Sequence, residues 1–143
     1  MDIRELSGKY SVSGQIAPDD MDDLRRAGFV AVISNRPDGE VTPDIASDTM
    51  AEAAKRAGLD FLYNPVTNGA LNERNVADQV AFLGQATGPI LAYCRSGMRS
   101  SVVWALGRAG IVAPDDLIDT AARAGYDISS MRAELDLLAK RNG

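Results

Sequence analysis

The sequence has 143 residues, 45% hydrophobic and 24% charged, which is enough for one compact domain over residues 1–143. Its net charge of -5 argues against a general binder of nucleic acid or of anionic membrane surfaces. One cysteine and no histidine exclude an internal disulfide, a Cys/His zinc site and every catalytic couple that needs an imidazole.

Short apolar runs bounded by glycine, proline or asparagine predict strands, and apolar residues at helical spacing predict helices. In chain order, we expect a strand at residues 9–13, a helix at 19–27, a strand at 29–33, a helix at 43–57, a strand at 59–63, a helix at 73–86, a strand at 89–93, and helices at 101–109, 114–124 and 130–140. The helix at 73–86 should turn Val76, Val80 and Leu83 inward.

This alternation predicts an α/β fold: a single domain with a central, mostly parallel sheet of four to five strands, flanked by helices on both faces. Ligands of such sheets bind at the carboxyl ends of the strands. The turn at 35–40 and the loop at 64–71 should therefore lie at the same rim as Cys94, which follows the strand at 89–93. The charged start of the chain has no apolar leader segment, and no apolar run approaches a membrane span, so we expect a cytoplasmic protein.

Cys94 lies where a strand passes into a helix, and we predict that it is a nucleophile. Backbone N–H groups and the helix dipole favour a thiolate there, Gly97 permits close approach, and Arg99 offers a fork of donors to an oxyanion. A lone cysteine is more often a small buried apolar residue, but the flanking arginines and serines do not fit a core. An enzyme requires this sulfur to be within reach of solvent. Besides the catalytic pair Cys94 and Arg99, the residues expected to bind the anion are Arg95, Ser96, Gly97, Met98, Ser100, Arg36 and Asp38.

The strand, cysteine, glycine-containing loop, Arg-Ser pair and helix resemble the anion loops of cysteine-dependent tyrosine and dual-specificity phosphatases, and also those of rhodanese sulfurtransferases. Residues 93–100, with segments 13–15, 32–40 and 124–127, resemble the beta-lactamase hydrolase-like, phosphatase-like domain family over nearly the whole chain. The resemblance implies a protein tyrosine or dual-specificity phosphatase-like fold rather than a rhodanese fold. We expect no cofactor and no metal. In some relatives this domain is joined to a metallo-hydrolase domain, which without histidine could only be a separate partner here.

The loop departs from the phosphatase pattern in ways that bear on the reaction. Its spacing between Cys94 and Arg99 is one residue shorter and equals that of rhodanese loops, and Tyr93 stands where phosphatases commonly carry histidine. The loop at 64–71 holds no carboxylate to protonate a leaving group, a step that contributes roughly a hundredfold or more. The carboxylates left as possible substitutes are Asp38, Glu40 and Glu73. Ser100 instead favours a phosphatase, because it matches the phosphatase hydroxyl that assists hydrolysis. It is equally suited to cap a helix.

Three functions follow, and the sequence favours the first. In a rhodanese-type sulfurtransferase, Cys94 takes sulfane sulfur from a small anionic or persulfide donor and passes it to a thiol acceptor or cyanide. In the alternative, a phosphatase, Cys94 attacks phosphorus while Arg99 holds the phosphoryl oxygens. The second alternative is a module that binds an anion or a persulfide without turnover.

Overall fold

A five-stranded sheet runs through the middle of the molecule in the computed structural model, which describes residues 1–68 and 71–142. Its spatial order is β1 (Arg4–Ser7), β2 (Tyr10–Ser13), β5 (Ile90–Tyr93), β3 (Ala31–Ser34) and β4 (Asp60–Tyr63). β1 is antiparallel to β2, and all other neighbouring strands are parallel. The predicted α/β fold with a mostly parallel sheet is confirmed.

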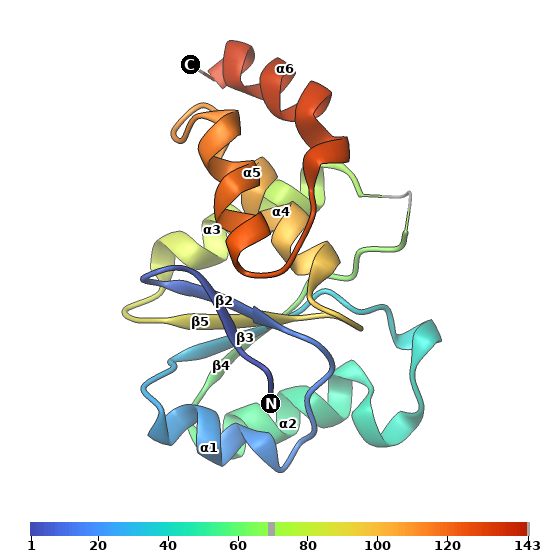
Figure 1. Cartoon of the computed structure of the whole chain (residues 1–143). Helices are drawn as coiled ribbons and strands as arrows, with labels where there is room; N and C mark the ends of the chain where they lie inside the picture. The colour runs from blue at the N-terminus through green and yellow to red at the C-terminus, as the bar shows by residue number, and fades with distance from the viewer. Residues whose placement is uncertain (69–70, 143) are drawn as a thin grey trace.

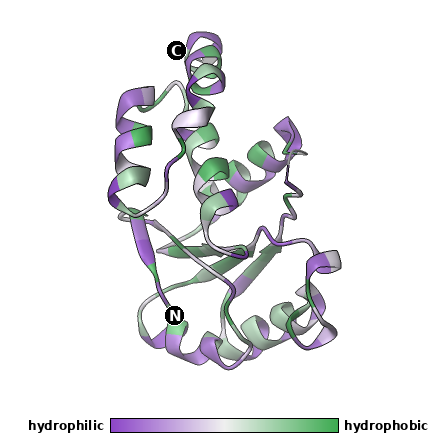
Figure 2. Ribbon diagram, turned by 45° about the vertical axis from the view of Figure 1, so that its right-hand side comes forward, coloured by the Kyte–Doolittle hydropathy of each residue, from purple (hydrophilic) through white to green (hydrophobic). Residues whose placement is uncertain are grey.

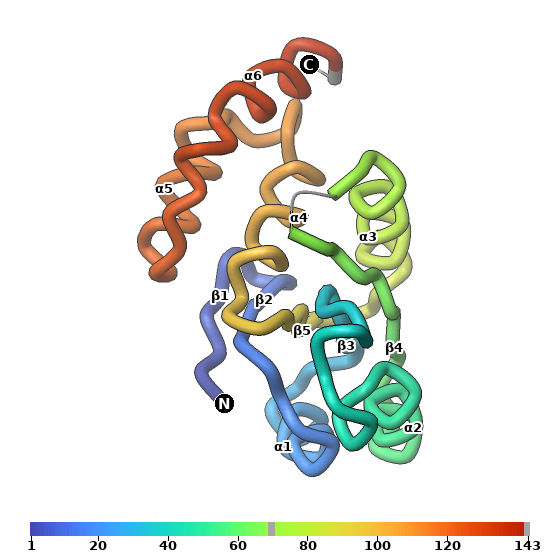
Figure 3. The backbone as a smooth tube through the Cα atoms, turned by 90° about the vertical axis from the view of Figure 1, so that its right-hand side faces the viewer, coloured from blue at the N-terminus to red at the C-terminus, as the bar shows by residue number. Residues whose placement is uncertain are grey.

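The four parallel strands are in register, so their carboxyl ends form one rim. Ser13 and Ser34 both pair with Tyr93, and Ser34 also pairs with Tyr63. Figure 3 looks onto this rim, where the segments that follow β5, β3 and β4 lie next to one another. The register thus brings the turn at 35–40 and the segment after β4 to the same edge as Cys94, while residues 69–70 of the predicted loop lie outside the described part of the chain.

Helices cover both faces of the sheet, and the two sides are unequal (Figure 1). One face carries α1 (Asp20–Arg26) and α2 (Ser47–Ala57). The other carries α3 (Glu73–Gln85) and α4 (Met98–Arg108), with α5 (Pro114–Arg123) and α6 (Arg132–Asn142) farther out. Hydrophobic residues are concentrated in the strands, whereas most helices present both hydrophobic and hydrophilic residues (Figure 2). None of the helices in the described ranges is long and apolar enough to span a membrane.

Each face of the sheet has its own apolar core. Met21, Leu24 and Met50 pack with Leu91 and other strand residues on the α1–α2 side. On the other side, a larger cluster contains strand residues together with apolar side chains of α4, α5 and α6; these helix residues include Trp104, Leu106, Leu117, Ala121 and Leu135. Because successive strand residues point to opposite faces, the continuous apolar runs supply both cores.

The structure departs from the prediction in three places. β1 was not predicted, because only Leu6 of its four residues is buried and the segment therefore has the composition of a charged tail. The expected helix at 43–57 is divided into a short 3-10 turn (Pro43–Ile45) and α2. Val80 was expected to face inward but is 45% exposed, because the neighbouring Gln79 occupies the buried side of α3.

Candidate active site

The segment after β5 turns around Cys94 and leads directly into α4. Cys94 Sγ accepts a hydrogen bond from the backbone N–H of Gly97 at 3.1 Å. Gly97 is the N-cap of α4 and has a φ of 97°, which residues other than glycine rarely adopt. The sulfur therefore contacts an amide hydrogen at the amino end of an 11-residue helix, where the helix dipole favours negative charge.

Two contacts from distant parts of the chain hold this loop in shape. The Tyr126 hydroxyl donates to the carbonyl of Ser96 at 3.0 Å, and a Cβ atom at Gly97 would lie only 2.2 Å from that hydroxyl oxygen. On the opposite side, the N–H of Gln15 donates to the carbonyl of Arg95 at 3.3 Å. Both contacts come from segments that carry the family resemblance, which explains why those segments accompany the cysteine loop.

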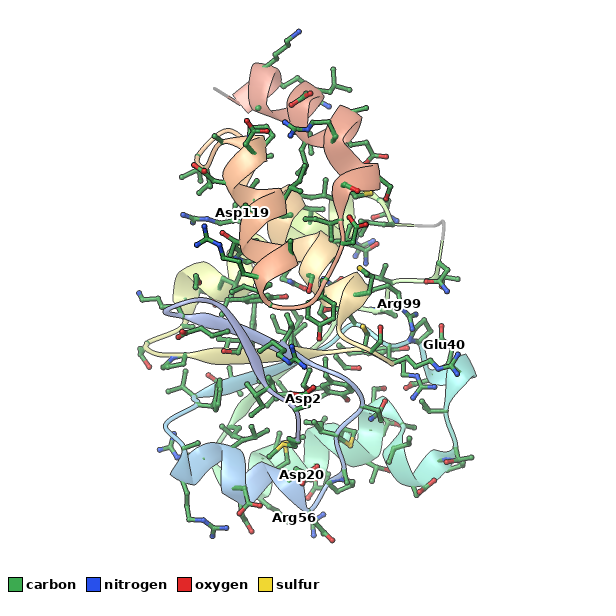
Figure 4. The ribbon with its side chains drawn as sticks, viewed as in Figure 1. Asp2, Asp20, Glu40, Arg56, Arg99 and Asp119 are labelled. Atoms are coloured by element: carbon green, nitrogen blue, oxygen red, sulfur yellow. The ribbon has the colours of Figure 1, made fainter. Side chains whose placement is uncertain are left out.

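The Arg99 guanidinium is fixed at the rim by Glu40, as Figure 4 shows. Nη1 and Nη2 of Arg99 each donate to a Glu40 oxygen at 2.8 Å, and Nη1 also donates to the carbonyl of Val66 at 2.8 Å. The hydrogen bonds to the Glu40 carboxylate raise the pKa of Arg99. Among the described residues no backbone or carboxylate acceptor engages Nε, and the Arg99 side chain is only 12% exposed.

Glu40 also binds Arg36, so it links the predicted anion-binding Arg36 to the predicted catalytic Arg99. Arg36 Nε lies 3.4 Å from Glu40 Oε1, its Nη2 donates to the Glu40 carbonyl at 3.2 Å, and its Nη1 donates to the Gln15 side chain at 3.1 Å. The sequence indicated Glu40 only as a substitute acid. Its contacts instead make it the residue that positions Arg99, and no local pattern could have shown this because the two are 59 residues apart.

The other predicted anion-binding residues have different surroundings. Both carboxylate oxygens of Asp38 accept hydrogen bonds from Ser47 at 2.7 Å, one from the N–H and one from the hydroxyl, so this side chain holds the start of α2. The side chains of Arg95 and Met98 are exposed beside the loop. Ser96 Oγ accepts from the N–H of Met98 at 3.3 Å and stabilises the turn.

Ser100 belongs to a buried ring of polar side chains that the sequence analysis missed. Its hydroxyl donates to Asn35 Oδ1 at 2.9 Å, Asn35 Nδ2 donates to Gln79 Oε1 at 3.0 Å, and Gln79 Nε2 donates to the Tyr10 hydroxyl at 2.8 Å. The Tyr10 hydroxyl closes the ring by donating to the Ser100 carbonyl at 2.9 Å. All four residues are at most 2% exposed. The ring fixes α4 to β2, to α3 and to the segment after β3, and the Ser100 hydroxyl donates its hydrogen bond to Asn35.

Cys94 itself is completely buried, with 0% of its surface exposed. The requirement that the sulfur lie within reach of solvent is therefore not met in this conformation. The loop closes around the sulfur because the Gly97 amide and the Arg99 guanidinium both approach it. A substrate has to displace part of this cover before the sulfur can react.

The described rim residues offer no carboxylic acid ready to protonate a leaving group. The hydrogen bonds from Arg99 hold the pKa of Glu40 below its ordinary value, so this carboxyl group is ionised at neutral pH. Glu73, whose side chain is 87% exposed, lies 3.5 Å from Arg141. Tyr93 also stays protonated, because burial raises its pKa to about 12.

Comparison with known sequences identifies relatives of this chain. Residues 2–111 match the sequence model of a family described as "Beta-lactamase hydrolase-like protein, phosphatase-like domain". Beta-lactamase hydrolase-like proteins of Agrobacterium fabrum and Xylella fastidiosa are each 28% identical to the chain, over 125 and 130 residues, respectively. These alignments cover 86% and 90% of this chain but only 29% and 30% of the relatives, so the chain spans less than a third of their length.

Solved structures with the same fold include proteins described as putative phosphatases. A "putative phosphatase" from Neisseria meningitidis is 31% identical, with a TM-score of 0.84 over 96% of this chain and 99% of that one. A protein of the same description from Shewanella putrefaciens is 21% identical, with a TM-score of 0.78 over 99% and 93% of the two chains, and this second likeness shows the fold alone.

Proposed function

Since this chain belongs to the beta-lactamase hydrolase-like protein, phosphatase-like domain family, we propose that it hydrolyses phosphate monoesters through a cysteinyl-phosphate at Cys94. The comparisons establish a cysteine-based, phosphatase-like protein, and they favour this alternative over the sulfur transfer that the sequence placed first. The observation that supports the proposal is the contact of Cys94 Sγ with the Gly97 amide at the amino end of α4, beside the Arg99 guanidinium.

The reaction proceeds in two displacements at phosphorus. The Cys94 thiolate forms the S–P bond while the ester P–O bond breaks and the alcohol or phenol leaves as an oxyanion. Arg99 and the loop amides stabilise the negative charge on the non-bridging oxygens in the transition state. Water then attacks phosphorus, the S–P bond breaks, and inorganic phosphate and the thiolate are released. Once the substrate has displaced part of the cover over the sulfur, Arg99 and the Gly97 amide serve both steps.

The rate of phosphate ester hydrolysis should depend strongly on the acidity of the leaving alcohol or phenol. With Glu40 ionised and Asp38 bound to Ser47, neither carboxylate is ready to donate a proton to the departing oxygen. General acid catalysis contributes roughly a hundredfold or more to such a step. We therefore expect aryl phosphates with acidic phenols to be hydrolysed and simple alkyl phosphates to be turned over at least about a hundredfold more slowly.

A second candidate is sulfur transfer, which the spacing of Cys94 and Arg99 favours because it equals that of rhodanese loops. The Cys94 thiolate would attack the outer sulfur of thiosulfate, forming a new S–S bond while the thiosulfate S–S bond breaks and sulfite leaves. Cyanide or an acceptor thiolate would then remove the sulfane sulfur and restore the thiolate. No acid is needed, because sulfite is a stable leaving group. The same absence of a proton donor that limits phosphatase activity is therefore no obstacle to this reaction.

One preparation of the protein can separate these two reactions. Release of phosphate from 4-nitrophenyl phosphate that is lost in Cys94→Ser supports the phosphatase. A mass increase of one sulfur after treatment with thiosulfate, removed by cyanide and absent in Cys94→Ser, supports the sulfurtransferase. If the folded protein shows neither activity and its Cys94 also resists iodoacetamide for hours, the sulfur is permanently covered and both proposals are wrong.

A further inference from the structure

A cavity of about 440 Å³ lies at the end of the sheet opposite Cys94. It is bounded by the turn before β2, the start of β5, α3 and the last turns of α4. These segments meet on the left of Figure 1, whereas the segment after β5 lies on the right. The volume falls within the range of roughly 300–1,000 Å³ that is usual for sites that bind small molecules. This cavity has no part in the reaction proposed above.

The cavity has apolar walls and remains open because glycines line part of it. Gly84 of α3 is one of these, and a Cβ atom placed there would contact nothing within 4 Å. Trp104 forms one wall and stacks on Tyr10, with ring centroids 6.5 Å apart and an interplanar angle of 17°. Val80 and Ile111 extend the apolar surface to the mouth, where they are 45% and 72% exposed. Such walls suit a ligand with a hydrocarbon body.

The charges at the cavity are all positive, although the whole protein has a net charge of -5. Lys9 and Arg108 are the charged residues of the lining, and both are exposed. Within the described ranges neither lies within 4.0 Å of a carboxylate, while most other arginines of the protein have such a partner; these include Arg4, Arg26, Arg36, Arg99, Arg123 and Arg132. Two cations without partners above an apolar cavity complement an anion with an apolar body.

We propose that this cavity binds a small amphipathic monocarboxylate, whose hydrocarbon body lies against Trp104 and whose carboxylate lies between Lys9 and Arg108. Burial of the hydrocarbon body supplies the main favourable free energy, and the two cations select a negatively charged head group. The cavity limits the ligand to a small body, and the guanidinium of Arg108 matches the two oxygens of a carboxylate.

Trp104 is the only tryptophan of the chain, so its fluorescence reports on this cavity directly. Titration of the full chain with decanoate should change the emission saturably, with a Kd below about 1 mM. Decanol, which has the same body without the charge, should bind at least about tenfold more weakly, and acetate should cause no change. An absence of saturation with decanoate, or equal affinities for decanoate and decanol, would overturn the proposal.

Two variants locate the binding. Lys9→Glu combined with Arg108→Glu should weaken decanoate binding at least about tenfold. The matched control, Lys55→Glu combined with Arg56→Glu on the exposed surface of α2, makes the same change in net charge and should leave binding unaltered. Equal weakening in both would mean that only net charge matters, and would refute the site.

Gly84→Leu places a side chain in the open space and should abolish binding without lowering the temperature of unfolding, since leucine favours the helix. Full binding by a folded Gly84→Leu variant would contradict the proposal.

Sedimentation tests whether a second copy of the chain covers the cavity. A stable dimer that dissociates on Ile111→Lys substitution would show that a second copy of the chain covers this face, and the proposal would then be wrong.

Discussion

Replacing Glu40 by glutamine tests whether Arg99 owes its position to this one carboxylate. The two side chains share a bidentate ion pair at 2.8 Å, and they are 31% and 12% exposed. Fully exposed ion pairs contribute about 0–1 kcal/mol because solvent screens them, whereas hydrogen bonds to charged groups contribute roughly 1.5–3 kcal/mol. This partly buried pair lies between the two, at about 1.4 kcal/mol, which corresponds to a factor of ten in an equilibrium constant.

We therefore expect Glu40→Gln to lower kcat/KM about tenfold, since glutamine has only one oxygen and its amide group opposes the second guanidinium nitrogen. The assay is hydrolysis of 4-nitrophenyl phosphate. Thiosulfate transfer is measured in parallel, because Arg99 lies beside the Cys94 sulfur that both proposed reactions use. Glu52→Gln provides the matched control: it makes the same substitution on α2, where Glu52 lies 4.0 Å from Arg56 and both side chains are more than half exposed.

A rise in kcat/KM in the Glu40→Gln variant would refute this reasoning. It would mean that the carboxylate competes with the substrate for Arg99, and that the pair must break before an anion can bind. Unchanged kinetics would mean that the Val66 carbonyl, which accepts from the same guanidinium at 2.8 Å, is sufficient to hold the side chain. Rescue by Glu40→Asp to near the original rate would support the positioning role, because it restores the charge.

Three further predictions concern the loop, α3 and the dependence on pH. Gly97→Ala should lower activity at least about a hundredfold, because the new methyl group would clash with the Tyr126 hydroxyl and the φ of 97° disfavours alanine. Steady-state kinetics would measure the loss of activity, and circular dichroism would show whether the fold is retained. Gly84→Ala should raise the free energy of unfolding in urea by about 0.5–1 kcal/mol, since the added Cβ has open space in a helix. The folded-state pKa of Glu40 is lowered by Arg99, so its contribution to stability is complete above the ordinary value of 4.5 and is lost as the pH falls through the lowered value. The contribution of this pair to the free energy of unfolding in urea should therefore stay constant from pH 7 to 5. The decrease in the free energy of unfolding at lower pH should be smaller in Glu40→Gln than in the original protein.

The sequence predicted the order of strands and helices correctly where local patterns decide it. β3 and β5 are short apolar runs and β2 alternates before Gly14, and these signals depend only on neighbouring residues. β1 was not predicted from the sequence, because its single buried residue, Leu6, gives no periodic pattern. Val80 was placed on the wrong side of α3 because a polar residue, Gln79, is buried in preference to it.

The burial of Gln79 depends on residues that are distant from it in the sequence, so no local pattern could predict it. It completes a ring with Tyr10, Asn35 and Ser100, and the partners in this ring are 44 to 90 residues apart in the chain. A polar residue on a helix is ordinarily solvated, and only the presence of partners with complementary donors and acceptors makes its burial favourable. Such partners become neighbours only after the sheet and both helices have assembled.

The sequence by itself determined that Cys94 follows a buried strand, precedes a helix, and has Gly97 and Arg99 at fixed spacing, because each of these facts is local. The tertiary structure decided that the sulfur is covered and that Arg99 is held by a carboxylate from 59 residues away. It also decided that the carboxylate is thereby kept ionised, which removes it as a proton donor. These properties depend on which side chains meet at the rim, and that is set by the register of four strands rather than by any single segment.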